Sequence, residues 1–229
     1  MELGEDLALT MNGRNLQGIA WNDGLHAQAQ RLCEAAHLCA SRGWVPATSG
    51  NFSLRDRATG RILITASGLD KGAITPTDLL EIDVDCYPIA GNGKPSAETS
   101  LHGVIYRAQP EARAIFHVHS IWNTLISDHF ANKGGFVLEG YELLKALSNV
   151  TTHKYRELVP ILENSQEYDE LSAELAAVLR NLPQVHCILL RRHGIYTWGE
   201  SVSGAWRHLE ALEFLFEAEC RRLMVPGSW

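Results

Sequence analysis

Two short apolar segments, 52–55 and 61–65, are separated by a turn at Thr59-Gly60, which predicts an antiparallel β-hairpin. Further strand patterns alternate with helical patterns along the chain and lie at 80–84, 114–119, 186–190 and 195–198. Strands that occur both as a hairpin and between helices predict a mixed or largely antiparallel sheet, covered by helices, in one α/β domain.

Helical patterns lie at 23–42, 97–109, 138–147, 168–181 and 201–222. Asp23 is a candidate N-cap and Gly43 a candidate stop for the first helix, and Ser201 or Ser203 is a candidate cap for the last. The sequence contains neither G-x-G-x-x-G nor G-x-x-x-x-G-K-[ST], so a doubly wound nucleotide-binding fold is not expected.

The length of 229 residues favours a single domain, which we expect to span residues 23–229 after an N-terminal tail of residues 1–22. The net charge of -7 argues against a protein that binds nucleic acid or anionic membranes. No apolar run is long enough to span a membrane, and the N-terminus lacks the pattern of a secretory signal. The five scattered cysteines contain no C-x-x-C pair, which favours the cytoplasm and argues against a cysteine zinc site.

His117 and His119 are two positions apart in a strand pattern, so their side chains are expected on the same face of the sheet. Two imidazoles on one face can bind a single metal ion. His193, which follows a buried strand pattern and precedes a glycine, is a candidate third ligand, and three ligands with an open position are typical of catalytic zinc. Each of these histidines, taken alone, also fits an ordinary hydrogen-bonded position on a strand. The other histidines lack a partner at ligand spacing and are expected at surface or satisfied core positions.

Three short turns, Thr48-Ser49-Gly50-Asn51, Ser67-Gly68 and Pro95-Ser96-Ala97, are rich in hydroxyl groups and glycine. Such turns can bind a phosphate through backbone N–H groups and hydroxyls, and a helix N-terminus such as the one near Ser96 favours anions. Ordinary turn and cap chemistry is the alternative for each turn taken alone.

Two carboxylates are candidate general acids or bases. Glu98 lies in the first turn of a predicted helix, where a favourable contact with the helix dipole is the alternative. Glu142 is predicted on a helix face, where solvent exposure is the alternative. The sequence pattern leaves both interpretations open.

Together, these motifs resemble the class II (zinc) aldolases and their relatives, which include fuculose-phosphate aldolase and ribulose-phosphate 4-epimerase. The motifs that carry the resemblance are Thr48-Ser49-Gly50-Asn51, Ser67-Gly68, Pro95-Ser96-Ala97-Glu98, His117-Val118-His119 and Arg192-His193-Gly194, and it covers residues 25–220. The resemblance implies a three-layer α/β/α sandwich with a central, largely antiparallel sheet. It also implies one Zn²⁺ per subunit and a homotetramer with sites near the subunit boundaries.

The resemblance further implies roles for individual residues. His117, His119 and His193 match the metal ligands. The phosphate-binding positions are matched by Ser49, Gly50, Asn51, Ser67, Gly68 and Ser96. Glu98 matches the glutamate of the aldolases and Glu142 a glutamate of the dehydratases, and which of the two is the main acid/base stays open.

Within this superfamily the chain is most similar to a branch of dehydratases, through the segments Pro46–Asn51, Glu142–Lys145, Val159–Asn164 and Arg191–Gly199. This resemblance implies the loss of water from a 5-methylthio ketopentose 1-phosphate through a metal-stabilised enediolate, a step of methionine salvage. The alternatives are an aldolase that cleaves a fuculose- or rhamnulose-type ketose 1-phosphate and a non-catalytic scaffold protein on the same fold. The metal motif does not separate the two enzymes, because both reactions use the same enediolate.

Overall fold

The computed structural model describes residues 18–225, which form a sheet with helices on both faces. The strands are β1 (Asn51–Arg55), β2 (Ile62–Thr65), β3 (Leu79–Ile82), β4 (Pro88–Gly91), β5 (Ala114–Val118), β6 (Gly135–Glu139), β7 (Arg156–Leu162), β8 (Cys187–Leu190) and β9 (Gly194–Gly199). The α-helices are α1 (Asp23–Ser41), α2 (Thr99–Ala108), α3 (Ile121–Phe130), α4 (Tyr168–Asn181) and α5 (Val202–Met224). Within this part of the chain, none of the helices has the length and apolar character needed to cross a membrane.

The strands form one sheet in the order β4-β3-β2-β1-β5-β9-β8-β7-β6. Neighbouring strands are antiparallel except for β7 and β8, which are parallel. The predicted hairpin is confirmed, because β1 pairs with β2 and places Ser53 opposite Ile64. The sheet is therefore largely antiparallel, with β1, β5 and β9 side by side at its centre.

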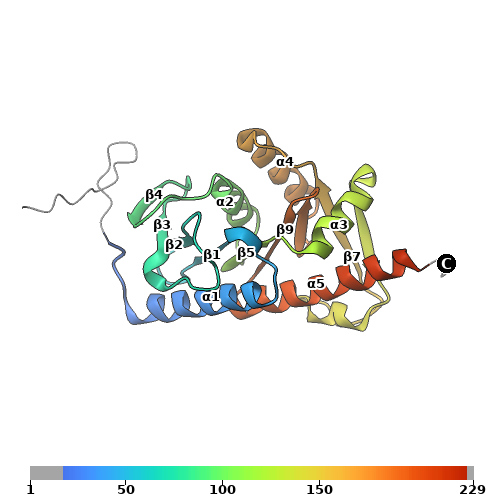
Figure 1. Ribbon diagram of the computed structural model, residues 1–229, viewed down its shortest axis with the longest axis horizontal. Helices are drawn as coiled ribbons and strands as arrows, with labels where there is room; N and C mark the ends of the chain where they lie inside the picture. The colour runs from blue at the N-terminus through green and yellow to red at the C-terminus, as the bar shows by residue number, and fades with distance from the viewer. Residues whose placement is uncertain (1–17, 226–229) are drawn as a thin grey trace, which may run out of the picture.

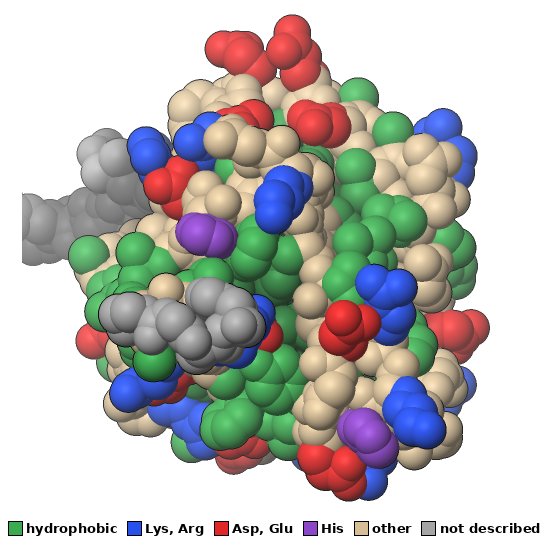
Figure 2. Space-filling view, turned by 90° about the vertical axis from the view of Figure 1, so that its right-hand side faces the viewer, with side chains coloured by type: hydrophobic (Ala, Val, Ile, Leu, Met, Phe, Trp, Pro, Cys, Tyr) green, Lys and Arg blue, Asp and Glu red, His purple; other side chains and the backbone are tan. Residues whose placement is uncertain are grey.

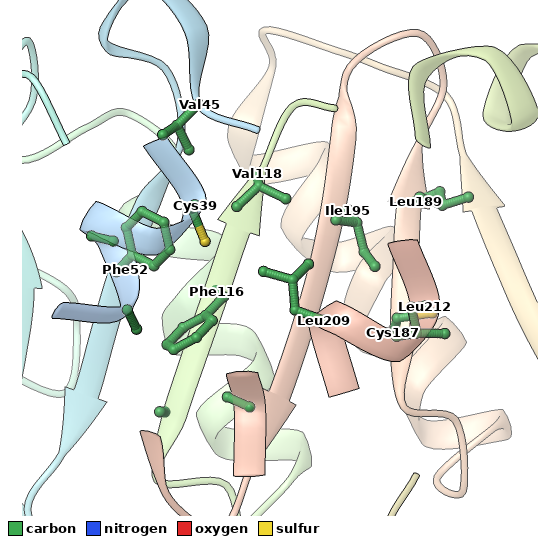
Figure 3. Packing of buried hydrophobic residues seen from close by; sticks show 14 of the residues in the cluster. Cys39, Val45, Phe52, Phe116, Val118, Cys187, Leu189, Ile195, Leu209 and Leu212 are labelled. Carbon is green, nitrogen blue, oxygen red and sulfur yellow. The ribbon is translucent and has the colours of Figure 1, made fainter. Parts of the chain in front are cut away.

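Two apolar clusters, one on each face of the sheet, confirm the three-layer sandwich. In Figure 1, α1 and α5 run along one side of the sheet, and α2 and α4 lie on the other side. Side chains of α1 and α5 pack against Phe52, Phe116 and Val118, as Figure 3 shows for part of this cluster. Side chains of α2 and α4 pack against the other face, which includes Ile115 and Tyr196.

Alternation along β5 decides where its histidine points. Phe116 and Val118 belong to the cluster beneath α1 and α5, whereas Ile115 belongs to the opposite cluster. Since residues at i and i+2 share a face, His117 points toward α2 and α4. The Phe116 side chain is fully buried, and its burial contributes about 1.5–3 kcal/mol to the free energy of unfolding.

Most predicted elements are confirmed, and the helix predicted over 168–181 matches α4 at both ends. The first helix begins as predicted, but its N-cap is Asn22 rather than Asp23, because the Asn22 side chain accepts a hydrogen bond from the Leu25 N–H. Ser201 caps α5 in the same way through the Gly204 N–H.

The helix predicted over 138–147 is wrong. Residues 135–139 form β6, in which buried Phe136 and Leu138 alternate with exposed Val137 and Glu139. Gly140, at a φ of 80°, ends the strand, and a single 3₁₀ segment follows at Glu142–Ala146. The leucines of 138–147 have helical spacing, but they belong to two short elements, β6 and the 3₁₀ segment. Strands β4 and β7 and helix α3 were not predicted.

Residues 1–17 of the predicted N-terminal tail (residues 1–22) lie outside the described residues. Of the remainder, Ile19 and Trp21 pack against the core and the Ala20 carbonyl accepts a hydrogen bond from Arg61. All five cysteines are free thiols. The division into a tail and one domain at residue 23 stays a prediction.

Candidate metal centre and active site

Strand register brings the first site residues together. Asn51 of β1 and Tyr196 of β9 are both cross-strand partners of His117 in β5. The rings of His117 and Tyr196 are stacked, with centroids 4.0 Å apart and an interplanar angle of 14°. His117 is fully buried by this packing. Three neighbouring strands of the rigid sheet centre thus fix the orientation of its imidazole.

The three predicted histidine ligands lie in one cluster with Glu98. His119 directly follows β5, His193 lies in the turn between β8 and β9, and Glu98 is the N-cap residue of α2. Each of the four residues offers one ligand atom, and these atoms all lie within 4.8 Å of one another. Nε2 of His119 is 2.7 Å from Nε2 of His117, and Nε2 of His193 is 2.9 Å from Oε1 of Glu98.

Two of the histidines are held with Nε2 directed into the cluster. Nδ1 of His117 lies 2.9 Å from the Ile195 carbonyl oxygen, and Nδ1 of His193 lies 3.0 Å from Oδ1 of Asn164. An oxygen acceptor at Nδ1 favours the tautomer in which Nδ1 carries the proton and Nε2 keeps its lone pair. Burial, followed by the charges of His117 and His193, lowers the pKa of His119 to about 3, so the His119 imidazole is neutral near pH 7.

The donor set therefore fits a metal ion. Three imidazoles and a carboxylate, whose ligand atoms lie within 4.8 Å of one another, match the nitrogen and oxygen ligands that zinc binds at about 2.0–2.2 Å. Polar acceptors behind two of the rings supply the outer contacts that orient metal-binding histidines.

Glu98 is a carboxylate held in its charged form. Burial raises the pKa of its carboxyl group. Hydrogen bonds and charge attraction from His117 and His193 lower it by more, so the pKa lies below its ordinary value. Oε2 of Glu98 also accepts a hydrogen bond of 2.7 Å from the Asn51 amide. The carboxylate can therefore bind a metal ion or accept a proton from a substrate.

A buried chain of hydrogen bonds continues from Asn51 into α2. Nε2 of His102 lies 2.5 Å from Oδ1 of Asn51, and Nδ1 of His102 lies 2.7 Å from the Ser53 hydroxyl, which contacts the Tyr106 hydroxyl at 2.9 Å. Burial lowers the pKa of His102 to about 3, so the neutral ring donates to Asn51 and accepts from Ser53. This chain fixes the Asn51 amide with its N–H groups toward Glu98. His102 is thus a satisfied core histidine, in accord with the prediction for the histidines outside the metal motif.

Glycine is required by space at position 194, next to the candidate ligand His193. A Cβ atom at this position would lie 2.4 Å from the Val118 carbonyl oxygen and 2.9 Å from atoms of both His117 and His119. Only a glycine at position 194 therefore lets the backbone of β9 lie this close to His117 and His119. The sequence signal for this role was the glycine that directly follows His193.

We expect Gly194→Ala to weaken zinc binding about 10- to 100-fold, as is typical when groups that orient metal ligands are disturbed. Zinc retention after dialysis against graded chelator measures the effect. Gly24→Ala is the matched control, since its Cβ would contact only the Asn22 side chain at 3.4 Å. Equal zinc retention in the two variants would contradict the steric role.

The residues predicted to bind phosphate line one pocket beside the cluster. The pocket has a volume of about 230 Å³ and is lined by Thr48, Ser49, Gly50, Asn51, Ala66, Ser67, Gly68, Lys71, Ser96, Glu98, His119 and Tyr168. All three predicted turns contribute to the pocket, and so do Glu98 and His119 of the metal cluster. Gly50 is also required by space, because its φ is 72° and a Cβ would lie 2.6 Å from the His117 carbonyl oxygen. Lys71 and Tyr168 were missed in the sequence.

Glu142 lies apart from this pocket within one chain. It begins the 3₁₀ segment after β6, and its side chain is 71% exposed. Its carboxylate forms ion pairs with Lys145 and His153. Hydrogen bonds and charge attraction from Lys145 lower the pKa of this carboxyl group.

The family model described as Class II Aldolase and Adducin N-terminal domain matches residues 30–220. The chain belongs to this family. The class II aldolase family is metal-dependent, in agreement with the histidine and glutamate cluster. The family resemblance inferred from the sequence motifs is therefore confirmed.

Curated relatives carry a more specific name. The methylthioribulose-1-phosphate dehydratase of Methylococcus capsulatus is 47% identical over 194 residues, which cover 85% of this chain and 93% of the relative. The dehydratase of the same name from Serratia proteamaculans is 41% identical and covers 88% of this chain and 98% of its own.

Solved structures of class II aldolases share the fold. L-fuculose-1-phosphate aldolase from Thermus thermophilus superposes with a TM-score of 0.67 at 26% identity, over 88% of this chain and 96% of the aldolase. The sugar-phosphate aldolase from Thermotoga maritima gives a TM-score of 0.67 at 21% identity, over 89% and 97% of the two chains.

Proposed function

We propose that this protein is a zinc-dependent methylthioribulose-1-phosphate dehydratase. It would convert 5-methylthioribulose 1-phosphate to 2,3-diketo-5-methylthiopentyl 1-phosphate in methionine salvage. The observation that carries the proposal is the cluster of His117, His119, His193 and Glu98 at the edge of a pocket built from three hydroxyl-rich turns. Relatives with that enzyme name, up to 47% identical, support the substrate.

His117, His119 and His193 would hold the ion through their Nε2 atoms. When bound, the zinc ion supplies a Lewis acid that polarises the carbon 2 carbonyl of the substrate and so acidifies the carbon 3 proton. The three turns would hold the phosphate, which fixes the distance between carbon 1 and the histidine cluster.

Glu98 is proposed to remove the carbon 3 proton. Its carboxylate is ionised and contacts two of the histidines, so it lies within reach of a substrate carbon held there. The Asn51 amide would hold Oε2 in place and leave Oε1 for the proton. The carbon 4 hydroxyl then leaves with a proton from an acid group, for which we propose Glu142. This role requires that Glu142 be protonated when it meets the substrate, away from the Lys145 ammonium that lowers its pKa in the single chain. Loss of the carbon 3 proton and the carbon 4 hydroxyl balances as one water, and tautomerisation gives the diketone.

We further propose that the protein is a cytoplasmic homotetramer and that Glu142 reaches the site of a neighbouring subunit. Figure 2 shows the end of the molecule where α5 finishes, with hydrophobic side chains gathered in the middle of the face and charged groups around them. Exposed hydrophobic side chains include Ile121 and Leu125 of α3 and Phe214 of α5. Such a surface is typical of a subunit contact. The exposed position of Glu142 fits a role across such a contact.

The proposal is tested by mass spectrometry of the products formed when the zinc-loaded protein meets 5-methylthioribulose 1-phosphate. We expect a product lighter by one water. Cleavage into dihydroxyacetone phosphate and an aldehyde would assign the protein to the aldolases instead. No turnover of this substrate, together with consumption of fuculose or rhamnulose 1-phosphate, would overturn the proposed substrate. A purified protein without bound metal would favour a non-catalytic scaffold protein.

A further inference from the structure

Lys71 is a buried lysine without a carboxylate partner. Its side chain is among the largest fully buried ones, with 1% of the residue exposed, and it lines the pocket beside the metal cluster. Within residues 18–225 no aspartate or glutamate forms an ion pair with it. A buried charge normally requires an opposite charge nearby, so an unpaired ammonium next to a pocket indicates that an anion binds there.

The hydrogen bonds of Lys71 leave one donor unused. Nζ donates to the carbonyl oxygens of Thr48 at 3.0 Å and Leu69 at 2.8 Å. A lysine ammonium has three N–H donors, so a third remains for an acceptor in the pocket. Burial lowers the pKa of Lys71, whereas the charges of Asp70 and Glu98 raise it, and a bound anion would hold the amine in its charged form.

The surrounding turns need the charge that Lys71 can supply. The backbone N–H groups of Ser49 and Ser67 already donate to the carbonyls of Pro46 and Lys94, so they do not serve a ligand. The Ser49 hydroxyl is buried and has no partner among the described residues. Of the described residues that line this pocket, Lys71 is the only lysine or arginine, so it is the one that can supply a full positive charge to an anion.

Lys71 also fixes the backbone that presents Ser49. Ala47, Thr48 and Gly50 have positive φ values of 51°, 63° and 72°, a conformation that is unfavourable for the first two residues. The bond from Nζ to the Thr48 carbonyl holds this strained turn against the 67–71 segment. One side chain thus joins two of the phosphate-binding turns.

We propose that Lys71 binds the phosphate dianion of the substrate and completes its third hydrogen bond only when the phosphate is present. This inference rests on the proposed function, because it assumes a phosphorylated substrate. Glu98 would repel the same dianion, so the phosphate lies at the Lys71 end of the pocket and carbons 2 and 3 lie at the histidine end. The substrate is oriented by these two opposite charges.

The test is calorimetric titration of the purified, zinc-loaded protein with inorganic phosphate, which requires no turnover. We expect Lys71→Met and Lys71→Gln to weaken phosphate binding about 10- to 100-fold, the usual effect of losing a charge-assisted hydrogen bond. Lys154→Met, which removes an exposed lysine, is the matched control and should bind as the wild type does. His119→Ala should still bind phosphate, which separates binding by Lys71 from binding by the metal.

Phosphate binding by the Lys71→Gln variant separates direct binding from a merely structural role. If Lys71 only held the 46–50 turn, Lys71→Gln, which keeps an N–H donor for a carbonyl, would bind phosphate nearly as well as the wild type. Phosphate binding within about threefold of wild type in either Lys71 variant would overturn the proposal. So would a loss of phosphate binding in His119→Ala, which would assign the anion to the metal. A protein that binds phosphate through Lys71 but dehydrates no methylthioribulose 1-phosphate would leave this inference standing and reject the proposed substrate.

Discussion

His119→Ala is expected to purify with little zinc and to lose about a thousandfold in dehydratase activity, because a Lewis acid contributes several kcal/mol and each 1.4 kcal/mol or so is tenfold in rate. His119 offers Nε2 to the cluster from a half-buried position at the pocket wall. Its removal takes one of the four donor atoms from the cluster and leaves two histidines and Glu98, so zinc should be held more weakly. Metal analysis of the purified variant and its rate with 5-methylthioribulose 1-phosphate measure the two effects.

His119 is a better choice than His117 for this test. His117 is fully buried and stacks on Tyr196, so its truncation would also leave a cavity in the sheet centre and lower stability. His129→Ala is the control, because His129 is exposed on α3 and its ring contacts only Phe130. A His119→Ala protein that keeps one zinc per chain would show that His119 is not needed to hold the ion.

The clustered histidines and the central strands were predictable because their signals are local. His117 and His119 share a face by the two-residue period of a strand, and the apolar segment around them is long enough to identify β5. The α4 helix was predicted over its full length, since it combines a regular apolar stripe at Leu171, Leu175 and Leu179 with acidic residues in its first turn. Such patterns need no knowledge of the rest of the chain.

The residues that complete the site depend on contacts between distant segments. Asn164 orients His193 from 29 positions away, after a strand that was not predicted at all. Lys71 becomes significant only because folding buries its ammonium between two turns. Its local pattern, Leu69-Asp70-Lys71-Gly72, is that of an ordinary surface loop. The wrong helix at 138–147 has a related cause, because β6 owes its existence to pairing with β7.

Glu98→Gln is expected to lower kcat about 100- to 10,000-fold while zinc content stays at the wild-type level, because glutamine cannot accept the carbon 3 proton. The three histidines remain, and the amide keeps the shape of the carboxylate next to Asn51. Exchange of the carbon 3 hydrogen with solvent deuterium should stop in parallel with turnover. Glu174→Gln, an exposed position on α4, is the control. Continued exchange in Glu98→Gln would assign proton removal to another group.

The second glutamate can be assigned by mixing two inactive proteins. If Glu142 acts in the site of a neighbouring subunit, a Glu98→Gln chain can lend its intact Glu142 to a Glu142→Gln chain that keeps Glu98. Random co-assembly should then restore about a quarter of the sites in a symmetric oligomer. If both glutamates act within one chain, every site in the mixture lacks one of them, and no activity returns. Glu142 is 71% exposed, and among residues 18–225 its ion-pair partners are Lys145 and His153, neither of which lines the pocket. We therefore expect activity to return in the mixture.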